Sequence, residues 1–522
     1  MRTVPGEAAP LTHRETMIVL AGLLSGLLLA ALDQTIVSTA LPTIVGEFGG
    51  LDHLSWVVTA YMLASTASMP LWGKVSDQFG RRIVFQAAIV TFLVGSVLCG
   101  VAQDMTGLIA FRAIQGLGGG GLLSLTFVIV GDIVPPRQRG RYAGYLTGVF
   151  AFASVAGPLL GGFFVDTLNW RWIFYVNLPI GVVALVVTSA VLHLPFEPTK
   201  ARIDLPGAAL MVGAVTTLLL LTVWGGQEYE WGSSVIVGLG LASAVLTVLF
   251  ILWERRAAEP ILPLRLFAEP VFTLSTIIAF LIGAALFGAT IFLPLFLQAV
   301  RGTSATGSGL LLMPMMAGIL VMSIVGGRMV SRTGRYKVYP VVGLGVATVG
   351  MALLSGLGVD SPSWHASAAM LVLGLGVGTC MPVLTVAVQN AISIRDLGVG
   401  TSAVNFFRTL GGALGVAVFG AVLSARLASE LAVRLPDVPL ADTAELTRSP
   451  EVIAALPDAT RIGVVTSLAE AIGTVFLVAA PVLFVSFLLA WLIPELPLRE
   501  TNALPAREGD GDPESRSVLA EL

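Results

Sequence analysis

The chain has 522 residues, of which 56% are hydrophobic and 12% are charged, and its net charge is −3. Soluble globular domains carry about 25% charged residues, so this composition excludes an ordinary soluble fold. The small net charge gives no reason to expect a nucleic-acid partner. Cys99 and Cys380 both lie in apolar stretches, and we therefore expect no disulfide framework.

Apolar stretches recur from Met17 to Trp491. Each is about 20 residues long, enough to cross about 30 Å of hydrocarbon as a helix. We predict an all-α polytopic membrane protein with fourteen spans, beginning with a retained helix and not with a cleaved signal peptide. In chain order the spans lie at 17–41, 54–72, 83–102, 107–131, 141–165, 172–193, 205–224, 233–253, 271–297, 307–326, 338–358, 365–390, 398–425 and 467–492.

The spans and the polar stretches between them predict a domain organisation. We expect a six-helix N-terminal half, two inserted helices and a six-helix C-terminal half, flanked by a polar N-terminus and a disordered tail. The expected bounds are 1–16 for the N-terminus, 17–193 for the first half, 194–256 for the insert, 257–494 for the second half with an external loop at 427–466, and 495–522 for the tail.

Lysine and arginine predict the orientation of the chain. Of the 29 basic residues, 21 fall in alternate loops on one side of the predicted membrane, which also holds both termini. Because cytoplasmic loops carry the excess of Lys and Arg, we expect both termini to be cytoplasmic. Lysine occurs only at 74, 200 and 337. This preference for arginine is typical of high-GC bacteria, and we expect a bacterial inner membrane.

A short motif occurs after the second and the tenth span. The segments 73–82 and 327–335 both fit Gly-x-x-x-[Asp/Ser]-x-x-Gly-Arg. Since both copies fall on the predicted cytoplasmic side, they indicate two repeated halves, a common plan of transporters.

These residues resemble the major facilitator superfamily, in particular its fourteen-helix drug:proton antiporter branch. The resemblance covers nearly the whole chain and rests on five segments in order at the expected helices. They are the first-helix motif 32–42, the loop motif A at 73–82, motif B at 112–119, motif C at 148–162 and the segment 170–181 that opens helix six. The resemblance implies the major facilitator fold and export of drugs in exchange for protons. One departure is Ser331, where motif A carries an acid, which predicts a weaker second copy.

Asp33 lies inside the first apolar helix, where an ionisable side chain is costly and marks a functional candidate. By its depth Arg112 is the natural partner, because both residues fall well inside the predicted membrane. Our hypothesis is that Asp33 exchanges a proton for substrate while Arg112 and Gln115 tune its affinity for the proton. The alternative is a static ion pair that only holds the first helix against the fourth.

The remaining motifs each allow a functional and a structural interpretation. Motif A would latch the inner side closed, or it would only set topology by positive charge; its residues are Gly73, Lys74, Asp77, Gly80, Arg81 and Arg82. The antiporter motif C would shape the seal between the halves, or it would serve plain helix packing; its residues are Gly148, Gly157, Pro158, Gly161 and Gly162.

A substrate cavity is expected between the halves near the membrane midplane. Arg408 would contact substrate or a counter-ion, or it would bond to backbone at a helix break near Gly411 and Gly412. Phenylalanines would line the cavity or, alternatively, would be lipid-facing or packed. The candidate lining residues are Phe150, Phe292, Asn405 and Arg408.

The leading function is therefore proton-coupled efflux of amphipathic drugs or natural products, with small hydrophobic or cationic substrates, protons and the lipid bilayer as partners. A dedicated exporter of one metabolite, antibiotic or lipid is the alternative. The chain has no Gly-x-x-x-x-Gly-Lys-[Ser/Thr] nucleotide motif, no metalloprotease or serine-hydrolase motif and four scattered histidines. We expect no enzyme activity, cofactor or metal, and a monomer.

Overall fold

A computed structural model describes residues 13–48, 54–192, 204–226, 228–303, 305–436, 452–453 and 456–499. Within these ranges the chain is helical, and its only β-type pairing is an isolated bridge between Gly225 and Tyr229. The all-α fold class predicted from the sequence is confirmed. Residues 1–12, most of the polar loop beyond Leu435, and 500–522 lie outside the described ranges.

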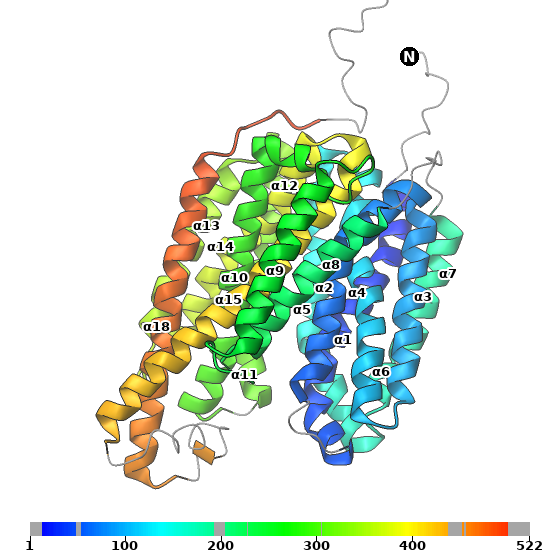
Figure 1. The fold of residues 1–522 in the computed structure, drawn as a ribbon. Coiled ribbons are helices and arrows are strands. Elements are labelled where there is room, and N and C mark those ends of the chain that lie inside the picture. The colour runs from blue at the N-terminus through cyan, green and yellow to red at the C-terminus, as the bar shows by residue number, and fades with distance from the viewer. Residues whose placement is uncertain are drawn as a thin grey trace, which may run out of the picture.

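The first half contains six membrane-length passes (Figure 1). A one-residue interruption at Val176 divides the sixth pass into two helices. The helices are α1 (His13–Phe48), α2 (Leu54–Phe79), α3 (Arg81–Gly100), α4 (Met105–Ile133), α5 (Pro136–Thr167), α6 (Trp172–Tyr175) and α7 (Asn177–Val191).

Two inserted helices and six further passes follow. The inserted pair is α8 (Leu205–Trp224) and α9 (Ser234–Glu254). The second half comprises η2 (Leu264–Ala268), α10 (Pro270–Leu295), η3 (Phe296–Val300), α11 (Ala305–Leu311), α12 (Met313–Thr333), α13 (Val338–Ser355), α14 (Ser363–Ala391), η4 (Ile394–Asp396), α15 (Leu397–Arg434) and α18 (Asp458–Trp491).

Thirteen passes among the described residues are apolar and long enough to cross a membrane. The remaining pass is α2, which corresponds to the predicted span 54–72. It has 26 residues but is less apolar than the other thirteen, and it packs extensively against α4 inside the same bundle. Five of its hydroxyl-bearing side chains are buried: Thr59, Ser65, Thr66, Ser68 and Ser76. Each of the fourteen predicted spans thus corresponds in order to a helical segment, and thirteen of these segments have the length and apolarity of a membrane span.

Three expectations need correction. The region 427–466 is not all loop, because α15 continues to Arg434 and α18 begins at Asp458. The proposed helix break near Gly411 and Gly412 is absent, since α15 runs through both positions. The first residues of the tail, 495–499, are packed against the bundle: the Arg499 N–H donates to Asn390 Oδ1 at 2.9 Å.

The repeated motif has the same local geometry in both halves. Its second glycine has a positive φ in each copy, 91° at Gly80 and 69° at Gly334, a region that favours glycine. Its first glycine, Gly73 or Gly327, touches a helix of the other half. The two copies therefore occupy equivalent places at one end of the bundle, which we call the basic end because the Lys- and Arg-rich loops lie there.

The closest approaches between the halves lie near the basic end. A Cβ on Gly140 of α5 would stand 2.2 Å from the carbonyl oxygen of Gly327 on α12. A Cβ on Gly73 of α2 would stand 2.8 Å from the carbonyl oxygen of Gly398 on α15. Such contacts leave no room for any side chain, as in other small-residue helix interfaces. The bundle is therefore closed at the basic end.

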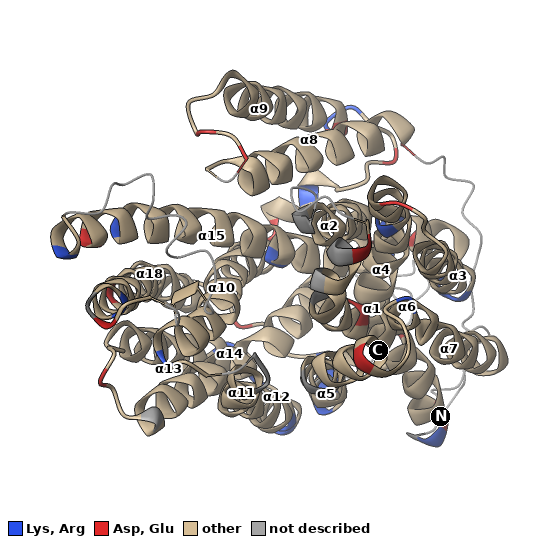
Figure 2. Ribbon diagram, turned by 90° about the horizontal axis from the view of Figure 1, so that it is seen from below, with Lys and Arg blue, Asp and Glu red and all other residues tan. Residues whose placement is uncertain are grey.

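The inserted hairpin lies beside this seam. Figure 2 shows α8 and α9 on one side of the bundle, next to α2 and α15. Helix α8 packs against both α2 and α15, whereas α9 packs mainly on α8. One half contributes α2 and the other contributes α15, so the insert covers a line along which the halves meet.

Alanine at position 140 should open the basic end. Its methyl group has no space beside Gly327, and overpacking of about 1–3 kcal/mol would shift the balance between closed and open arrangements by about 5- to 150-fold. Spin labels at Gln138→Cys and Arg332→Cys, both exposed positions, should report longer distances by pulsed electron paramagnetic resonance.

The native cysteines are buried and should not label. Gly420→Ala, whose methyl group would meet nothing within 4 Å, is the control. An unchanged distance distribution in Gly140→Ala would contradict the proposed close packing.

Candidate functional site

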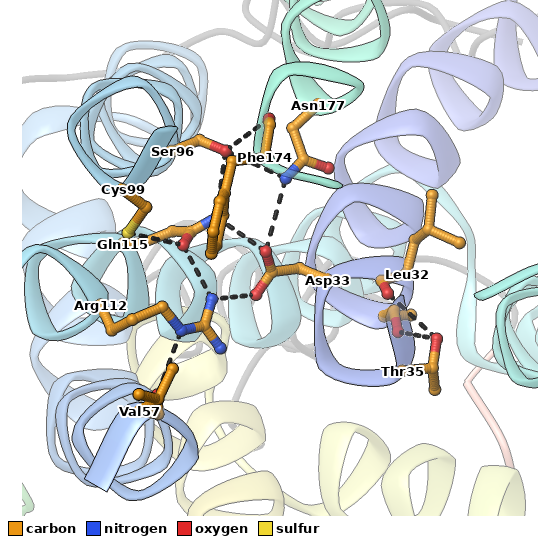
Figure 3. Close-up of polar contacts among 11 residues, drawn as sticks. Leu32, Asp33, Thr35, Val57, Ser96, Cys99, Arg112, Gln115, Phe174 and Asn177 are labelled. Carbon is orange, nitrogen blue, oxygen red and sulfur yellow. Dashed lines mark hydrogen bonds and ion pairs between the residues drawn. The ribbon is translucent and has the colours of Figure 1, made fainter. Parts of the chain in front are cut away.

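A buried ion pair lies inside the first half (Figure 3). Nη1 of Arg112 on α4 stands 2.5 Å from Oδ2 of Asp33 on α1, and the side chains are 1% and 0% exposed. The structure therefore pairs the two residues that were expected to meet by depth. Each charge compensates the other, which makes burial of both tolerable in an apolar bundle.

Amide and hydroxyl groups complete the polar network around Asp33. Gln115 Nε2 donates to Asp33 Oδ1 at 2.8 Å, and Gln115 Oε1 accepts from Arg112 Nη1 at 2.8 Å. Asn177 Nδ2 lies 3.4 Å from the same Asp33 oxygen and donates to Ser96 Oγ at 3.0 Å. The network thus joins four helices, α1, α3, α4 and α7, and Ser96 of α3 supports the two amides that face Asp33.

Aromatic rings enclose the guanidinium of Arg112. Its Cζ lies 4.4 Å from the centre of the Tyr61 ring and 5.9 Å from that of Phe174, within the range of cation–π attraction. Its Nε donates to the Val57 carbonyl at 3.2 Å. These contacts hold the cation in place from α2 and α6 as well as from Asp33.

Glycines allow the contributing helices to approach. A Cβ on Gly95 of α3 would lie 2.4 Å from the backbone nitrogen of Gln115, and one on Gly116 of α4 would lie 2.4 Å from the Tyr61 carbonyl oxygen. Both contacts are too short for any larger residue. Gly95 therefore lets α3 approach α4 beside Gln115, and the motif B glycine Gly116 lets α4 approach α2 beside Tyr61.

Sequence reasoning missed three members of this site. Asn177 lies in the segment 170–181, one of the five that carry the family resemblance, but it was not predicted to have a functional role. Neither Ser96 nor Tyr61 was predicted to belong to the site. A buried amide at the start of an apolar helix was the available signal for Asn177. Ser96 and Tyr61 carried none, because serine and tyrosine are common in membrane helices.

Motif A forms a second charged cluster, at the basic end. Arg81 Nη1 lies 2.5 Å from Asp77 Oδ1, and Arg81 Nε lies 2.6 Å from Oδ2 of Asp132 at the end of α4. The other oxygen of Asp77 accepts a hydrogen bond of 3.1 Å from the backbone N–H of Val399. This N–H belongs to the first turn of α15, so the carboxylate caps a helix of the opposite half.

The other basic residues of motif A have separate partners. Lys74 Nζ lies 2.9 Å from Glu259 Oε2, in the segment that leaves the inserted hairpin. Arg82 donates to the Ser189 carbonyl of α7 at 2.6 Å. Asp77 is the charged group of motif A that accepts a hydrogen bond from α15 of the second half.

The motif C residues divide between two interfaces. Gly157 and Gly161 pack on α1, where an added Cβ would meet Thr35 Oγ1 at 2.0 Å and Thr39 Oγ1 at 1.9 Å. A Cβ on Gly148 would instead stand 3.7 Å from Leu320 Cδ1 of the second half. Gly162 has open space, and Pro158 is exposed. The motif therefore mainly fits α5 against α1, close to Asp33, and only Gly148 borders the seam.

A cavity of about 280 Å³ lies between the halves. Of the four expected lining residues, Phe150, Asn405 and Arg408 border it. Phe292 does not: it is 5% exposed and packs in the core of the second half. An apolar side chain gives no sequence signal that separates a cavity wall from a core.

The ion pair and the cavity are neighbours but not one space. Gln34, which follows Asp33 on α1, borders the cavity, whereas Asp33 and Arg112 do not. Met62 and Ser65 of α2 border it as well, one residue and one turn beyond Tyr61. The Asp33 site therefore lies directly behind one wall of the cavity.

Asp33→Asn should destabilise the protein, because it leaves the Arg112 charge buried without its counter-charge. Removing one partner of a buried pair costs about 3–5 kcal/mol. The double variant Asp33→Asn/Arg112→Met should recover at least half of the loss. Both expectations can be tested by heating the detergent-purified protein. The fraction that remains folded is measured as the height of the monodisperse peak in size-exclusion chromatography.

The exposed pair Arg461–Asp458, with N and O 2.7 Å apart, offers the matched control. Asp458→Asn should change stability by at most about 1 kcal/mol. Equal melting of Asp33→Asn and the wild type would show that the buried pair does not hold the helices together.

Comparison with known proteins agrees with this architecture. A human organic anion transporter, MFSD10, matches with a TM-score of 0.61 and 17% identity, covering 91% of this chain and 99% of its own. The proton:xylose symporter XylE also has a TM-score of 0.61, with 15% identity and coverage of 92% and 96%. At these identities the likeness shows the fold alone.

Sequence relatives are much closer. An uncharacterized MFS-type transporter of Mycobacterium tuberculosis, Rv1877, is 42% identical over 501 residues, 95% of this chain and 72% of the relative. The multidrug transporter protein MdtP of Bacillus subtilis is 40% identical over 426 residues, 82% and 78% of the two chains. Residues 23–416 match the sequence profile of the Major Facilitator Superfamily. The chain therefore belongs to the Major Facilitator Superfamily of membrane transporters.

Proposed function

We propose that this protein exports amphipathic drugs or natural products by alternating access, in exchange for protons. The observation that carries the proposal is a buried Asp33–Arg112 pair directly behind a cavity shared by both halves. Relatives named as a multidrug transporter and as efflux pumps support the direction of transport. A dedicated exporter of one metabolite is the second candidate, since the cavity alone does not define the breadth of substrates.

Asp33 is proposed as the proton-exchanging group, with Arg112 and Gln115 as its tuning partners. Protonation removes the negative charge that compensates Arg112, so the pair cannot survive proton binding unchanged. Arg112 would then depend on the Tyr61 and Phe174 rings, Gln115 and the Val57 carbonyl. Because Tyr61 and Val57 belong to α2 and Gln115 to α4, a change at Asp33 acts directly on helices that form the cavity wall.

Motif A is proposed as the latch of the cytoplasmic gate. The positive-inside rule assigns the basic end to the cytoplasm. There Asp77 caps the first turn of α15 across the seam, while Arg81 holds Asp77 and Asp132 together. Opening the gate requires breaking the bond from Val399 to Asp77. We further propose a monomer in a bacterial inner membrane with both termini cytoplasmic.

Asp77→Asn should weaken this latch, because an amide interacts less strongly with a helix N-terminus than a carboxylate does. We expect a rise in the open-gate population and about tenfold slower transport. The labels at positions 138 and 332 should report longer distances in this variant. Glu228→Gln, an exposed change at the other end of the bundle, should leave them unaltered. Unchanged distances in Asp77→Asn would reject the latch.

Proton coupling is tested in inside-out membrane vesicles with an acidified interior. A proton-coupled exporter moves added substrate into such vesicles and carries protons out of their interior. A fluorescent ΔpH probe should therefore show alkalinisation of the interior. We expect this response in the wild type and at least a tenfold smaller one in Asp33→Asn at equal expression. A panel of lipophilic anions, cations and neutral antibiotics should be added in turn.

Each result bears on a different part of the proposal. Equal responses in the two proteins would move the proton site away from Asp33. Uptake of substrate without proton release would contradict proton coupling. A response to one compound only would favour the dedicated exporter.

A further inference from the structure

Arg408 has no part in the coupling site described above. It lies on α15, its side chain is partly exposed, and it borders the central cavity. Its one hydrogen bond among the described residues runs from Nη1 to the sulfur of Met381 at 3.3 Å. No carboxylate of the described chain forms an ion pair with it. A cation inside a membrane protein without a counter-ion is costly, and such groups usually mark a substrate or ion pathway.

The backbone of Arg408 is held firmly in place. A Cβ on Gly283 of α10 would stand 2.0 Å from the carbonyl oxygen of Arg408, and a Cβ on Gly411 would stand 2.0 Å from that of Phe280. These reciprocal contacts lock α15 against α10 at the level of the guanidinium. Gly411, near which a helix break was considered, instead helps to fix the position from which Arg408 reaches the cavity.

The described lining of the cavity carries positive charge only. Its ionisable members are Arg408 and Arg139, and it includes no aspartate, glutamate or histidine. Arg139 donates from Nε to the Val134 carbonyl at 2.7 Å and adds its charge at the basic end of the space. Asp33 does not balance the charge of Arg408, because it lies behind the wall and is paired with Arg112.

The rest of the lining is mainly apolar. Aromatic and thioether side chains from both halves face the cavity, which suits the apolar body of an amphipathic molecule. They are Met62, Met69, Phe127, Phe150, Phe287 and Met316. Asn405 and Thr409, one turn or less from Arg408, add polar groups beside the guanidinium.

We propose that the cavity selects amphipathic anions, whose negative charge is attracted to Arg408 while the apolar body lies against this lining. The inference rests on the proposed export function and specifies its substrate class. It also replaces the expectation of cationic substrates, for which the described lining offers no carboxylate. The guanidinium presents several N–H donors in a planar fork that matches carboxylate and sulfonate groups.

Tetraphenylborate and tetraphenylphosphonium allow a direct test, since they share four phenyl groups and differ in the sign of their charge. The full-length protein in detergent is heated with a thiol-reactive dye, and buried Cys99 and Cys380 report unfolding. A ligand that binds the folded state raises the melting temperature in a concentration-dependent way. We expect tetraphenylborate to raise the melting temperature. Tetraphenylphosphonium should need at least a tenfold higher concentration for the same rise.

Variants then locate the anion contact. Arg408→Gln should weaken tetraphenylborate binding at least tenfold, and Arg408→Lys should retain part of the affinity. Arg332→Gln removes an exposed arginine outside the cavity and should change nothing. If Arg408→Gln fails to fold, the wild-type comparison of the two ions and the lysine variant still decide the question.

Equal effects of the two ions, no effect of either, or full tetraphenylborate binding by Arg408→Gln would overturn the inference. The assay uses no pH gradient and no transport. A failure here would therefore leave the vesicle result intact, whereas missing proton release in vesicles would reject the proton coupling of export and not the anion preference.

Discussion

The packing of the first half depends on the buried ion pair of Asp33 and Arg112. Neither charge can be buried alone in an apolar bundle, and their mutual attraction compensates desolvation only when the geometry is good and further hydrogen bonds are made. Gln115, Asn177 and the Tyr61 ring supply those contacts. Each comes from a different helix, so the pair requires α1, α2, α4 and α7 to meet closely. Gly116 allows α4 to approach α2, and Gly95 allows α3 to approach α4 beside Gln115. Packing, electrostatics and proposed function therefore depend on the same few contacts.

The two halves repeat one plan but distribute charge differently. Both use the first glycine of their motif at the seam, Gly73 against α15 and Gly327 against α5. The contact that we propose as a latch, however, occurs in the first copy only: Asp77 accepts a hydrogen bond from α15 across the seam, whereas Ser331 bonds to the Gly327 carbonyl of its own helix at 3.0 Å. The departure from motif A seen in the sequence thus has a structural counterpart. Inside the membrane the first half holds a neutral pair, and the second half presents an uncompensated Arg408 to the cavity.

Much of this arrangement follows from the sequence, and the exceptions have physical reasons. Fourteen passes were predictable because hydrocarbon thickness sets helix length, and Arg112 was recognisable as the partner of Asp33 because both charges lie deep in apolar segments. Phe292 was assigned to the cavity wrongly, since hydrophobicity does not tell a wall from a core. The contact of Asp77 with Val399 was not predictable at all: it joins residues 322 positions apart through a backbone N–H that carries no sequence signal. The role of Gly411 was misread because glycine permits both a break and close packing.

The separation of the two charged sites has an energetic consequence for export. If one proton enters at Asp33 while one monovalent anion leaves from Arg408, two positive charges in effect move inward per cycle. A monovalent cationic substrate exchanged for one proton would move no net charge. Each charge that crosses is driven by about 2.3 kcal/mol per 100 mV of membrane potential. An anion exporter of this design would therefore use the electrical gradient as well as the pH gradient, and would retain driving force when the two sides have equal pH. The neutral pair in one half and the lone arginine in the other thus suit a carrier whose substrate, and not only its proton, responds to the membrane potential.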